Sequence, residues 1–300
     1  MSRRTSPSTH LRYGVTRVLR VWELPRSTFY AHRARQAQPA ARPPARRGRP
    51  PIVDDATLLA HIRTVIAESP FHGEGHRKMW ARLRVLKQVR TSMRRVLRVM
   101  READLLAPTR QPEPVVQHPH DGTIVTDQPN VMWGTDATAA VTLTEGTVTI
   151  FAAIDHCTAE CVGIHVAKRS DRFEALEPIR QGVRDHFGGL APASATGLAL
   201  RHDHGSVYLS ADFQAEITFL GMTSSPAFVR QPEGNGCIER FFRTLKEQLL
   251  WVRHFTTIEE LRQALLTFKE TYNREWLIGR LGYRSPAQVR HALMVIRPLA

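Results

Sequence analysis

The hydrophobic positions of residues 54–108 repeat at the spacing of α-helices. One set follows Asp54 and Asp55, which suit the start of a helix, and consists of Leu58, Leu59, Ile62, Val65 and Ile66. A short second helix is expected in the segment HRKMWARLRVL. A third helix is predicted to begin near Thr91 and Ser92, and its apolar face consists of Met93, Val96, Leu97 and Met100. This part of the chain is therefore predicted to form a small three-helix domain.

Residues 1–35 carry a shorter helical pattern. Two short helices, VTRVLRV at 15–21 and PRSTFYAHR at 25–33, are predicted around a tight turn. The pair resembles a helix-turn-helix, whose second helix enters the major groove of DNA, but any small helical hairpin has the same pattern. Residues 36–53 are rich in Pro, Ala and Arg without apolar periodicity, which is typical of an extended linker, and a second break covers 109–129.

After residue 130 the period changes from helical to short runs of β-branched and apolar residues. The predicted strands are 131–141, 147–155, 161–167, 197–203 and 222–227, and the predicted helices between them are 172–186 and 210–219. A Thr-Glu-Gly turn separates the first two strands, so the first three are expected to be antiparallel. Strands first and alternation later predict a mixed α/β sheet with flanking helices over residues 130–296.

Charge is distributed unevenly along the chain. The 300 residues contain 42 Lys+Arg and 28 Asp+Glu, which gives a net charge of +14. Residues 1–115 hold 24 of the basic and 8 of the acidic residues, a net charge of +16, so the remainder is almost neutral. A basic first half predicts a nucleic-acid partner for that half, although an Arg-rich surface also serves solubility alone.

Composition also bears on the compartment. No apolar run approaches the roughly 18 residues that a membrane span requires, and no signal peptide is indicated. Three cysteines, an odd number in a long chain, indicate no disulfide framework. The sequence therefore predicts a cytoplasmic protein without a membrane partner.

Two sets of arginines are candidates for DNA contacts. The third predicted helix carries four on one face, which either follow phosphates or are simply solvated, namely Arg94, Arg95, Arg98 and Arg101. Arg47 and Arg49 lie in an Arg-Gly-Arg-Pro run that resembles the core of an AT-hook, a segment that lies in the A·T-rich minor groove.

Three acidic residues stand at informative positions. Asp136 is inside the first predicted strand, where a carboxylate is costly to bury unless it is paired or binds a cation. Asp203 ends the fourth strand, and ligands gather at the carboxyl ends of strands. Glu239 begins an amphipathic helix after the segment PEGNG. The three are expected to converge, unless Asp136 pairs with an arginine, Asp203 begins a turn and Glu239 is only a surface residue.

Such a set of oxygen ligands suits a hard divalent cation. Mg²⁺ is held by a few carboxylates together with water and phosphate oxygens. Two ions about 4 Å apart activate the attacking oxygen and stabilise the leaving oxygen in phosphodiester chemistry. This arrangement requires no general base from the protein.

The motifs around these acids carry a family resemblance. WGTDAT, HDHGSVY and GNGCIERFFRTLK, with thirty-five residues between the last two acids, resemble the DDE signature of retroviral-type integrases and bacterial insertion-sequence transposases. The match to the insertion-sequence-three family is close and covers nearly the whole chain, including SPFHGEGHRKMWARLR and FKETYNREWLIGRLGYRSPAQ. The resemblance implies an RNase H-like core, dependence on Mg²⁺ or Mn²⁺ with two ions, and cleavage followed by strand transfer at transposon ends. Asp136, Asp203 and Glu239 would then be the catalytic metal ligands.

The resemblance adds a basic residue and shows a departure. Lys246 follows Glu239 by seven residues, two turns along the same predicted helix, where the family commonly has a basic residue thought to contact DNA. Where the family usually reads His-Ser-Asp-Arg-Gly, this chain has Arg201, His202, Asp203, His204 and Gly205. The roles of the two histidines are not predicted.

The most direct interpretation is a DDE-type transposase that acts on double-stranded DNA as a homo-oligomer. A DNA-binding relic or repressor without catalysis would use the basic half alone, and an RNase H-type nuclease would share the carboxylates. In the resembled family, an upstream reading frame often supplies a further helix-turn-helix and a heptad-repeat helix by frameshift fusion. No sustained heptads are found here, so we expect this chain to require such an upstream product for end-specific binding.

Overall fold

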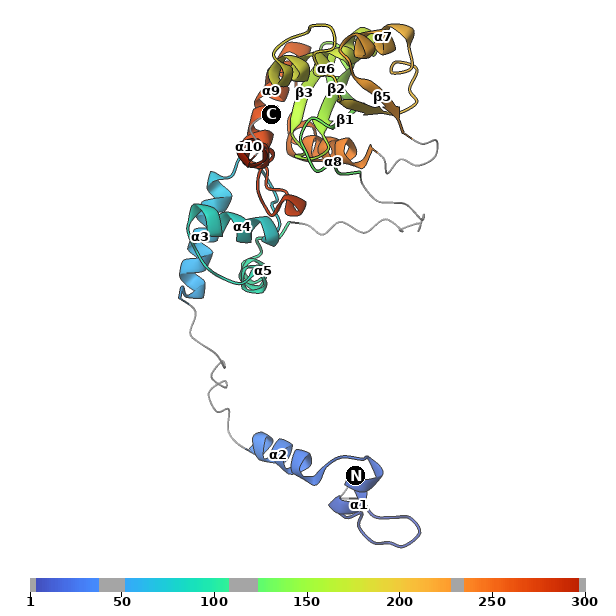
Figure 1. Cartoon of the computed structure of the whole chain (residues 1–300). Coiled ribbons are helices and arrows are strands. Elements are labelled where there is room, and N and C mark those ends of the chain that lie inside the picture. The colour runs from blue at the N-terminus through green and yellow to red at the C-terminus, as the bar shows by residue number, and fades with distance from the viewer. Residues whose placement is uncertain (1–3, 38–51, 108–123, 228–234, 297–300) are drawn as a thin grey trace. The chain divides into compact units, whose positions relative to one another are not determined.

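The computed structural model describes residues 4–37, 52–107, 124–227 and 235–296 (Figure 1). The chain divides into two compact units, Met1–Ile52 and Val53–Ala300. The finer predicted division, with boundaries at 35, 53, 108, 129 and 296, stays a prediction. None of the described helices is long and apolar enough to cross a membrane.

The first unit contains the two short helices that the N-terminal pattern predicts. Helix α1 spans Val15–Val21 and α2 spans Arg26–Ala37. Leu19 is buried, whereas Trp22 and Tyr30 are exposed. The candidate minor-groove arginines Arg47 and Arg49 lie outside the described residues.

Three helices open the second unit: α3 Asp55–Glu68, α4 His76–Leu86 and α5 Met93–Glu102. The Asp54 side chain caps α3 by accepting from the Thr57 amide at 2.8 Å, and Ser92 caps α5 in the same way. The three-helix core consists of Leu58, Ile62, Val65, Met79, Leu83, Val89, Val96, Val99 and Met100. The predicted apolar face of α5 was therefore partly wrong, because Val99 is buried while Leu97 and Met93 are only half-buried.

A five-stranded mixed sheet forms the rest of the core, in the order β3-β2-β1-β4-β5. The strands are β1 Met132–Thr142, β2 Gly146–Asp155, β3 Cys161–Ala167, β4 Ala199–His202 and β5 Thr223–Pro226. The first three are antiparallel, while β4 runs parallel to β1 and β5 runs parallel to β4. The predicted fold class, a mixed α/β sheet with flanking helices, is confirmed.

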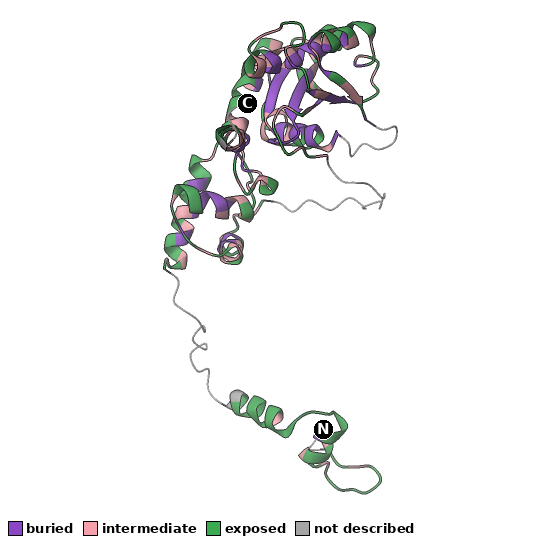
Figure 2. Ribbon diagram, in the orientation of Figure 1, coloured by how far each residue is buried: buried purple, intermediate pink, exposed green. Residues whose placement is uncertain are grey.

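Helices cover both faces of this sheet, and the buried residues gather between the layers (Figure 2). Helices α6 Arg172–Phe187 and α7 Ala211–Phe219 pack with Trp133, Phe151 and Phe213 on one face. Helices α8 Gly236–Leu245 and α9 Ile258–Glu275 pack with Ile150 and Phe241 on the other. Side chains of β2 alternate between the two layers, as the period of two along a strand requires. The chain continues through η2 Lys246–Leu250, η3 Gly279–Leu281 and α10 Pro286–Ile296.

Within the second unit, the three-helix domain packs against the end of α9, and we call this contact the domain joint. Phe71 meets the Trp276 ring edge-on at 4.8 Å, and the Lys78 Nζ lies 2.7 Å from the centroid of the same ring. Arg82 forms a buried ion pair with Glu74 at 2.5 Å and also donates to the carbonyl oxygen of Glu275. These contacts connect the helical domain to the sheet domain with both apolar and ionic groups.

Candidate carboxylate site and DNA-binding surface

Asp136 lies in the middle of β1, on the face that α8 covers. Its neighbour across the ladder is Ala152 of β2, and its Oδ1 accepts a hydrogen bond from the Ala137 amide at 2.8 Å. Burial raises the pKa of Asp136 to about 6, and the negative charges of Asp203 and Glu239 raise it further, whereas Lys246 acts in the opposite direction. A half-buried carboxyl on a central strand therefore has two like charges as neighbours.

Asp203 lies directly after β4 and is exposed. Its Oδ1 accepts from the Gly205 amide at 2.8 Å, which fixes the turn that follows the strand. A Cβ atom on residue 205 would stand 2.8 Å from the same oxygen, so a larger residue there would displace the Asp203 carboxylate. The strand was predicted to include Asp203, but it ends one residue earlier, at His202.

Glu239 is in the first turn of α8 and is exposed. The helix buries Cys237, Ile238 and Phe241 against the core and leaves Glu239 exposed. This amphipathic pattern is the one that the sequence indicates. It places the carboxylate at the end of the helix nearest to the loop that precedes it.

The three carboxylates come from distant segments. The negative charges of Asp203 and Glu239 both raise the pKa of Asp136, so the three groups interact electrostatically. In the described part of the chain, however, no three His, Cys, Asp or Glu side chains form a group that could hold a metal ion. The assignment of Asp136, Asp203 and Glu239 as metal ligands therefore stays a prediction.

Lys246 lies where the backbone changes from an α-helix to a π-helix. The sequence predicts one helix from Glu239 through Lys246, but α8 ends at Leu245 and the next five residues form a π-helical turn. The wider turn alters the direction of side chains relative to a continuous α-helix. Lys246 is half-buried, and its positive charge lowers the pKa of Asp136, so it lies on the same side as the carboxylates.

The two histidines around Asp203 hold the turn against β5. His202 is buried, and its Nδ1 donates to the carbonyl oxygen of Asp203 at 2.6 Å while its Nε2 lies 2.9 Å from the Ser224 hydroxyl. The ring also stacks on Tyr208 with centroids 5.6 Å apart. The His204 Nε2 lies 2.6 Å from the carbonyl oxygen of Ala227. Sequence reasoning left both roles open, because their partners lie more than twenty residues away.

The arginines of α5 separate into two kinds. Arg95 and Arg98 form ion pairs with Asp55 at 2.7 and 2.6 Å, and Arg95 also donates to the Val53 carbonyl oxygen, so both connect α5 to the start of α3. Arg94 and Arg101 are exposed. DNA contact by any of the four stays a prediction, but two of them have a structural partner that the sequence pattern did not indicate.

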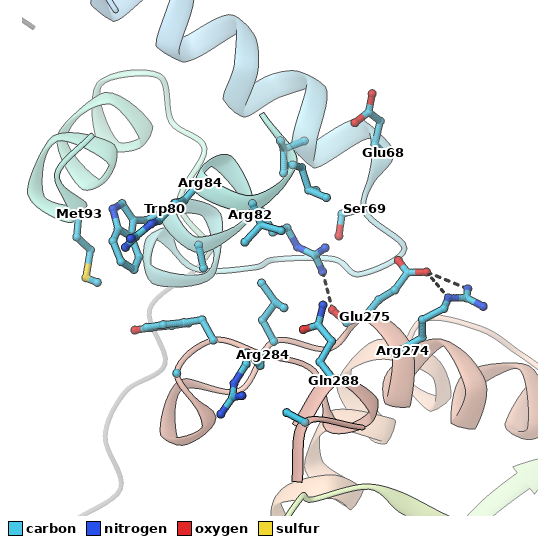
Figure 3. Close-up of a pocket in the computed structure, with 18 residues that line it drawn as sticks. Glu68, Ser69, Trp80, Arg82, Arg84, Met93, Arg274, Glu275, Arg284 and Gln288 are labelled. Carbon is cyan, nitrogen blue, oxygen red and sulfur yellow. Dashed lines mark hydrogen bonds and ion pairs between the residues drawn. The ribbon is translucent and has the colours of Figure 1, made fainter. Parts of the chain in front are cut away.

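A pocket of about 830 Å³ lies at the domain joint and not at the carboxylates (Figure 3). Its walls include Trp80 and Arg82 of α4, Glu275 of α9 and Gln288 of α10. None of Asp136, Asp203 and Glu239 lines it. It is a cleft between the two domains of the second unit.

Comparison with known protein families identifies two domains. The HTH-like domain family matches residues 53–113, and the integrase core domain family matches residues 220–286. The first match covers the three helices α3–α5. The second begins before β5 and includes Glu239 and Lys246.

Curated relatives come from bacterial insertion elements. Transposase InsD for insertion element IS2A/D/F/H/I/K of Escherichia coli is 28% identical over 244 residues, which are 78% of each protein. A 48.2 kDa uncharacterized protein of insertion element IS2A from the same species is 28% identical over 248 residues. This alignment covers 79% of the present chain but only 57% of that relative.

Comparison with solved structures finds partial matches to retroviral proteins. They include a simian T-cell lymphotropic virus intasome in complex with PP2A regulatory subunit B56 gamma, with a TM-score of 0.47 and 17% identity over 79% of this chain and 74% of that one. The HTLV-2 integrase catalytic core domain in complex with magnesium gives a TM-score of 0.42 and 17% identity over 55% of this chain and 99% of that one. The curated relatives show that the chain is similar to insertion-element transposases, and the two family matches place an HTH-like domain before an integrase core domain.

Proposed function

We propose that the protein is a DDE-type transposase, a polynucleotidyl transferase that cleaves insertion-element DNA and joins the freed ends to a target. The observation that carries this proposal is the half-buried carboxyl of Asp136 on the central strand β1, with Asp203 after the neighbouring strand β4 and Glu239 in the first turn of α8. The charges of Asp203 and Glu239 both raise the pKa of Asp136, in agreement with this placement. Homology to InsD transposases supports the substrate class. Asp136, Asp203 and Glu239 are proposed as the catalytic residues.

The chemistry of these residues fits a divalent cation. Burial of Asp136 next to two further carboxylates raises its pKa, and this cost is relieved when a cation neutralises the shared negative charge. Oxygen ligands of this type suit Mg²⁺ or Mn²⁺ rather than a softer metal. We propose that Asp136, Asp203 and Glu239 hold two such ions.

Bound divalent ions would supply Lewis-acid stabilisation of charge at the reacting phosphodiester. The protein's own contribution is positioning. The ladder of β1 fixes Asp136, and the Gly205 amide orients Asp203. Lys246, on the same side, is proposed to contact a DNA phosphate and to hold the strand near the carboxylates.

DNA binding is proposed to involve the HTH-like domain and the basic first half of the chain. The exposure of Arg94 and Arg101 on α5 supports phosphate contacts by these two residues. Phosphate contacts by Arg95 and Arg98 are proposed in addition to their ion pairs with Asp55. The proposed partners are transposon ends, target DNA, further copies of the chain and an upstream-frame product. These substrates would place the protein at the bacterial nucleoid.

A DNA-binding repressor without catalysis is less consistent with the observations. Such a protein would have no need for three carboxylates that act on one another at the cost of a raised pKa. An RNase H-type nuclease would use the same acids but would not join ends. Metal-dependent joining of a marked 3′ end to a second duplex distinguishes the three activities.

The test uses the full chain, labelled transposon ends and Mg²⁺. Asp203→Asn and Glu239→Gln preserve side-chain shape but remove a metal-binding charge, so we expect joining to fall at least about a hundredfold, since loss of ligand charge costs several kcal/mol. Asp185→Asn, on the exposed side of α6, is the matched control and should join at the wild-type rate. Joining at the wild-type rate by either of the first two variants would exclude this assignment.

A further inference from the structure

Asn235 stands at the start of α8 but does not cap it. An asparagine at this position usually accepts a hydrogen bond from the second or third amide of the helix, and here no such bond forms. Its Nδ2 instead donates to the carbonyl oxygen of Thr135 in β1 at 3.3 Å. The side chain is 5% exposed. A residue suited to stabilise its own helix therefore links that helix to the strand of Asp136.

His156, directly after β2, approaches the same part of β1 as Asn235. Its Nδ1 lies 2.8 Å from the carbonyl oxygen of Ile124, so this nitrogen donates and Nε2 carries the lone pair. Its amide donates to Met132, and its carbonyl oxygen accepts from Arg280. His156 is fully buried, with its ring fixed by the bond to Ile124 and its backbone by the bonds to Met132 and Arg280.

Gly134 is the place where the two side chains meet. A Cβ atom there would stand 2.7 Å from the His156 Nε2 and 3.0 Å from the Asn235 Oδ1, so only glycine admits this approach. Among the described residues, neither of these two atoms has a hydrogen-bond partner. Both are polar atoms packed closely over the strand, next to the residue whose carbonyl oxygen Asn235 holds.

The contact at Gly134 lies close in sequence to two of the carboxylates, Asp136 on β1 and Glu239 on α8. Gly134 and Asp136 are two residues apart on β1 and so share a face, about 6.6 Å apart along the strand. Asn235 and Glu239 are four residues apart, which is one turn or about 6 Å along the helix. Fixing Asn235 over Gly134 therefore restricts where Glu239 lies relative to Asp136.

From this geometry we propose that Asn235 is a positioning residue, which holds the start of α8 against β1 and so sets the separation of the Glu239 and Asp136 carboxylates. The proposal rests on the proposed function, because the separation matters only if these carboxylates share cations. It assigns no direct contact with DNA to Asn235. Its consequence is that loss of the link weakens divalent-ion binding while the fold survives.

The experiment compares Asn235→Ala with Asn273→Ala in the full chain. Asn273 is the matched control because its amide likewise joins a helix to a strand, α9 to β3, through two bonds of 2.9 Å to the backbone of Cys161. Mn²⁺ binding is measured without DNA by the loss of the free-ion electron paramagnetic resonance signal, and thermal unfolding is measured in parallel. We expect at least tenfold weaker Mn²⁺ binding for Asn235→Ala and a change of less than twofold for Asn273→Ala, although both variants unfold at lower temperature.

A second variant covers the case in which Asn235→Ala does not fold. Gly134→Ala introduces the Cβ that would push the two side chains away, and it should weaken Mn²⁺ binding to a similar degree. Joining by either variant should recover in part at saturating Mn²⁺. Mn²⁺ binding within twofold of wild type in a folded Asn235→Ala or Gly134→Ala overturns the positioning role, and so does failure of both to fold. A wild-type chain that binds no Mn²⁺ and joins no DNA refutes the proposed function itself.

Discussion

The domain joint and the carboxylate site both remove charged side chains from water, but they do so in opposite ways. At the joint, Arg82 and Glu74 are 7% and 3% exposed and form a direct ion pair, and the Lys78 ammonium lies over the Trp276 ring. At the site, Asp136 has two further carboxylates as charged neighbours, and Lys246 offsets them only in part. At the joint, the paired charges hold the two domains together. At the site, the carboxylates repel one another, so binding of a cation there is favourable.

The pKa directions express the same contrast. Burial lowers the pKa of Lys78 to about 7, and the charge of Glu74 acts against this shift. Burial raises the pKa of Asp136 to about 6, and its acidic neighbours act with this shift. In the joint, Glu74 favours the charged form of Lys78, although Arg82 opposes it. In the site, Asp203 and Glu239 disfavour the charged form of Asp136, although Lys246 favours it. A neighbour that favours the charged form is expected in a structural contact, and one that opposes it indicates function.

The largest expected change in the free energy of unfolding is for a substitution in the domain joint. Glu74→Gln leaves the buried Arg82 guanidinium without its carboxylate and removes the charge nearest to Lys78, so we expect the free energy of unfolding to fall by about 3–5 kcal/mol. The control is Glu68→Gln, whose pair with Lys87 is exposed and should contribute no more than about 1 kcal/mol. Urea unfolding at neutral pH measures both. Equal effects for the two variants would show that burial of the pair has no special role.

The sequence predicts the parts of this contrast that depend on local pattern. Short runs of β-branched and apolar residues predict β1–β3, and a carboxylate inside the first of these runs singles out Asp136. Amphipathicity identifies α8 and leaves Glu239 on its exposed side. These features depend on residues only two to four positions apart.

The features that the sequence does not predict depend on distant partners. Arg95 and Arg98 read as a basic face because Asp55, which pairs with both, is about forty residues earlier. The sequence assigns no role to Asn235, and only the position of β1 shows that its side-chain amide reaches Thr135. The π-helical turn at Lys246 has no signal in the hydrophobic period. Each of these features depends on contacts between segments that are far apart in the sequence, so the local pattern does not predict it.

At the carboxylate site, we expect a substitution to change the free energy of unfolding by less, and to increase it rather than lower it. Asp136→Asn removes a carboxyl whose pKa of about 6 in the folded protein lies above its usual 3.8. The folded protein therefore holds this proton more tightly than the unfolded chain, and wild-type stability falls as the pH rises from about 4 through 6. Without divalent ions at pH 7, the variant should be more stable than wild type by about 1–3 kcal/mol.

The measurement is urea unfolding of both proteins at pH 4 and pH 7 with a chelator present. The advantage of Asp136→Asn should vanish at pH 4, where the wild-type carboxyl is protonated. Addition of Mg²⁺ at pH 7 should stabilise wild type more than the variant. A variant that is less stable than wild type at pH 7 would mean that Asp136 is paired like the residues of the joint.

The smallest expected effects separate the arginines of α5. Arg95→Gln breaks a pair that is only partly exposed, so we expect a loss of about 1 kcal/mol in the free energy of unfolding and little change in the salt dependence of DNA binding. Arg94→Gln, one residue earlier and exposed, should leave stability unchanged. If Arg94 contacts a phosphate, the slope of log affinity against log salt becomes shallower by about 0.9 for that variant alone. Binding is measured with one duplex at several salt concentrations, because a single affinity does not separate a lost phosphate contact from a loosened helix. The reverse result, a shallower slope for Arg95→Gln and lower stability for Arg94→Gln, would show that the ion pair with Asp55 opens on DNA and that α5 uses its other face.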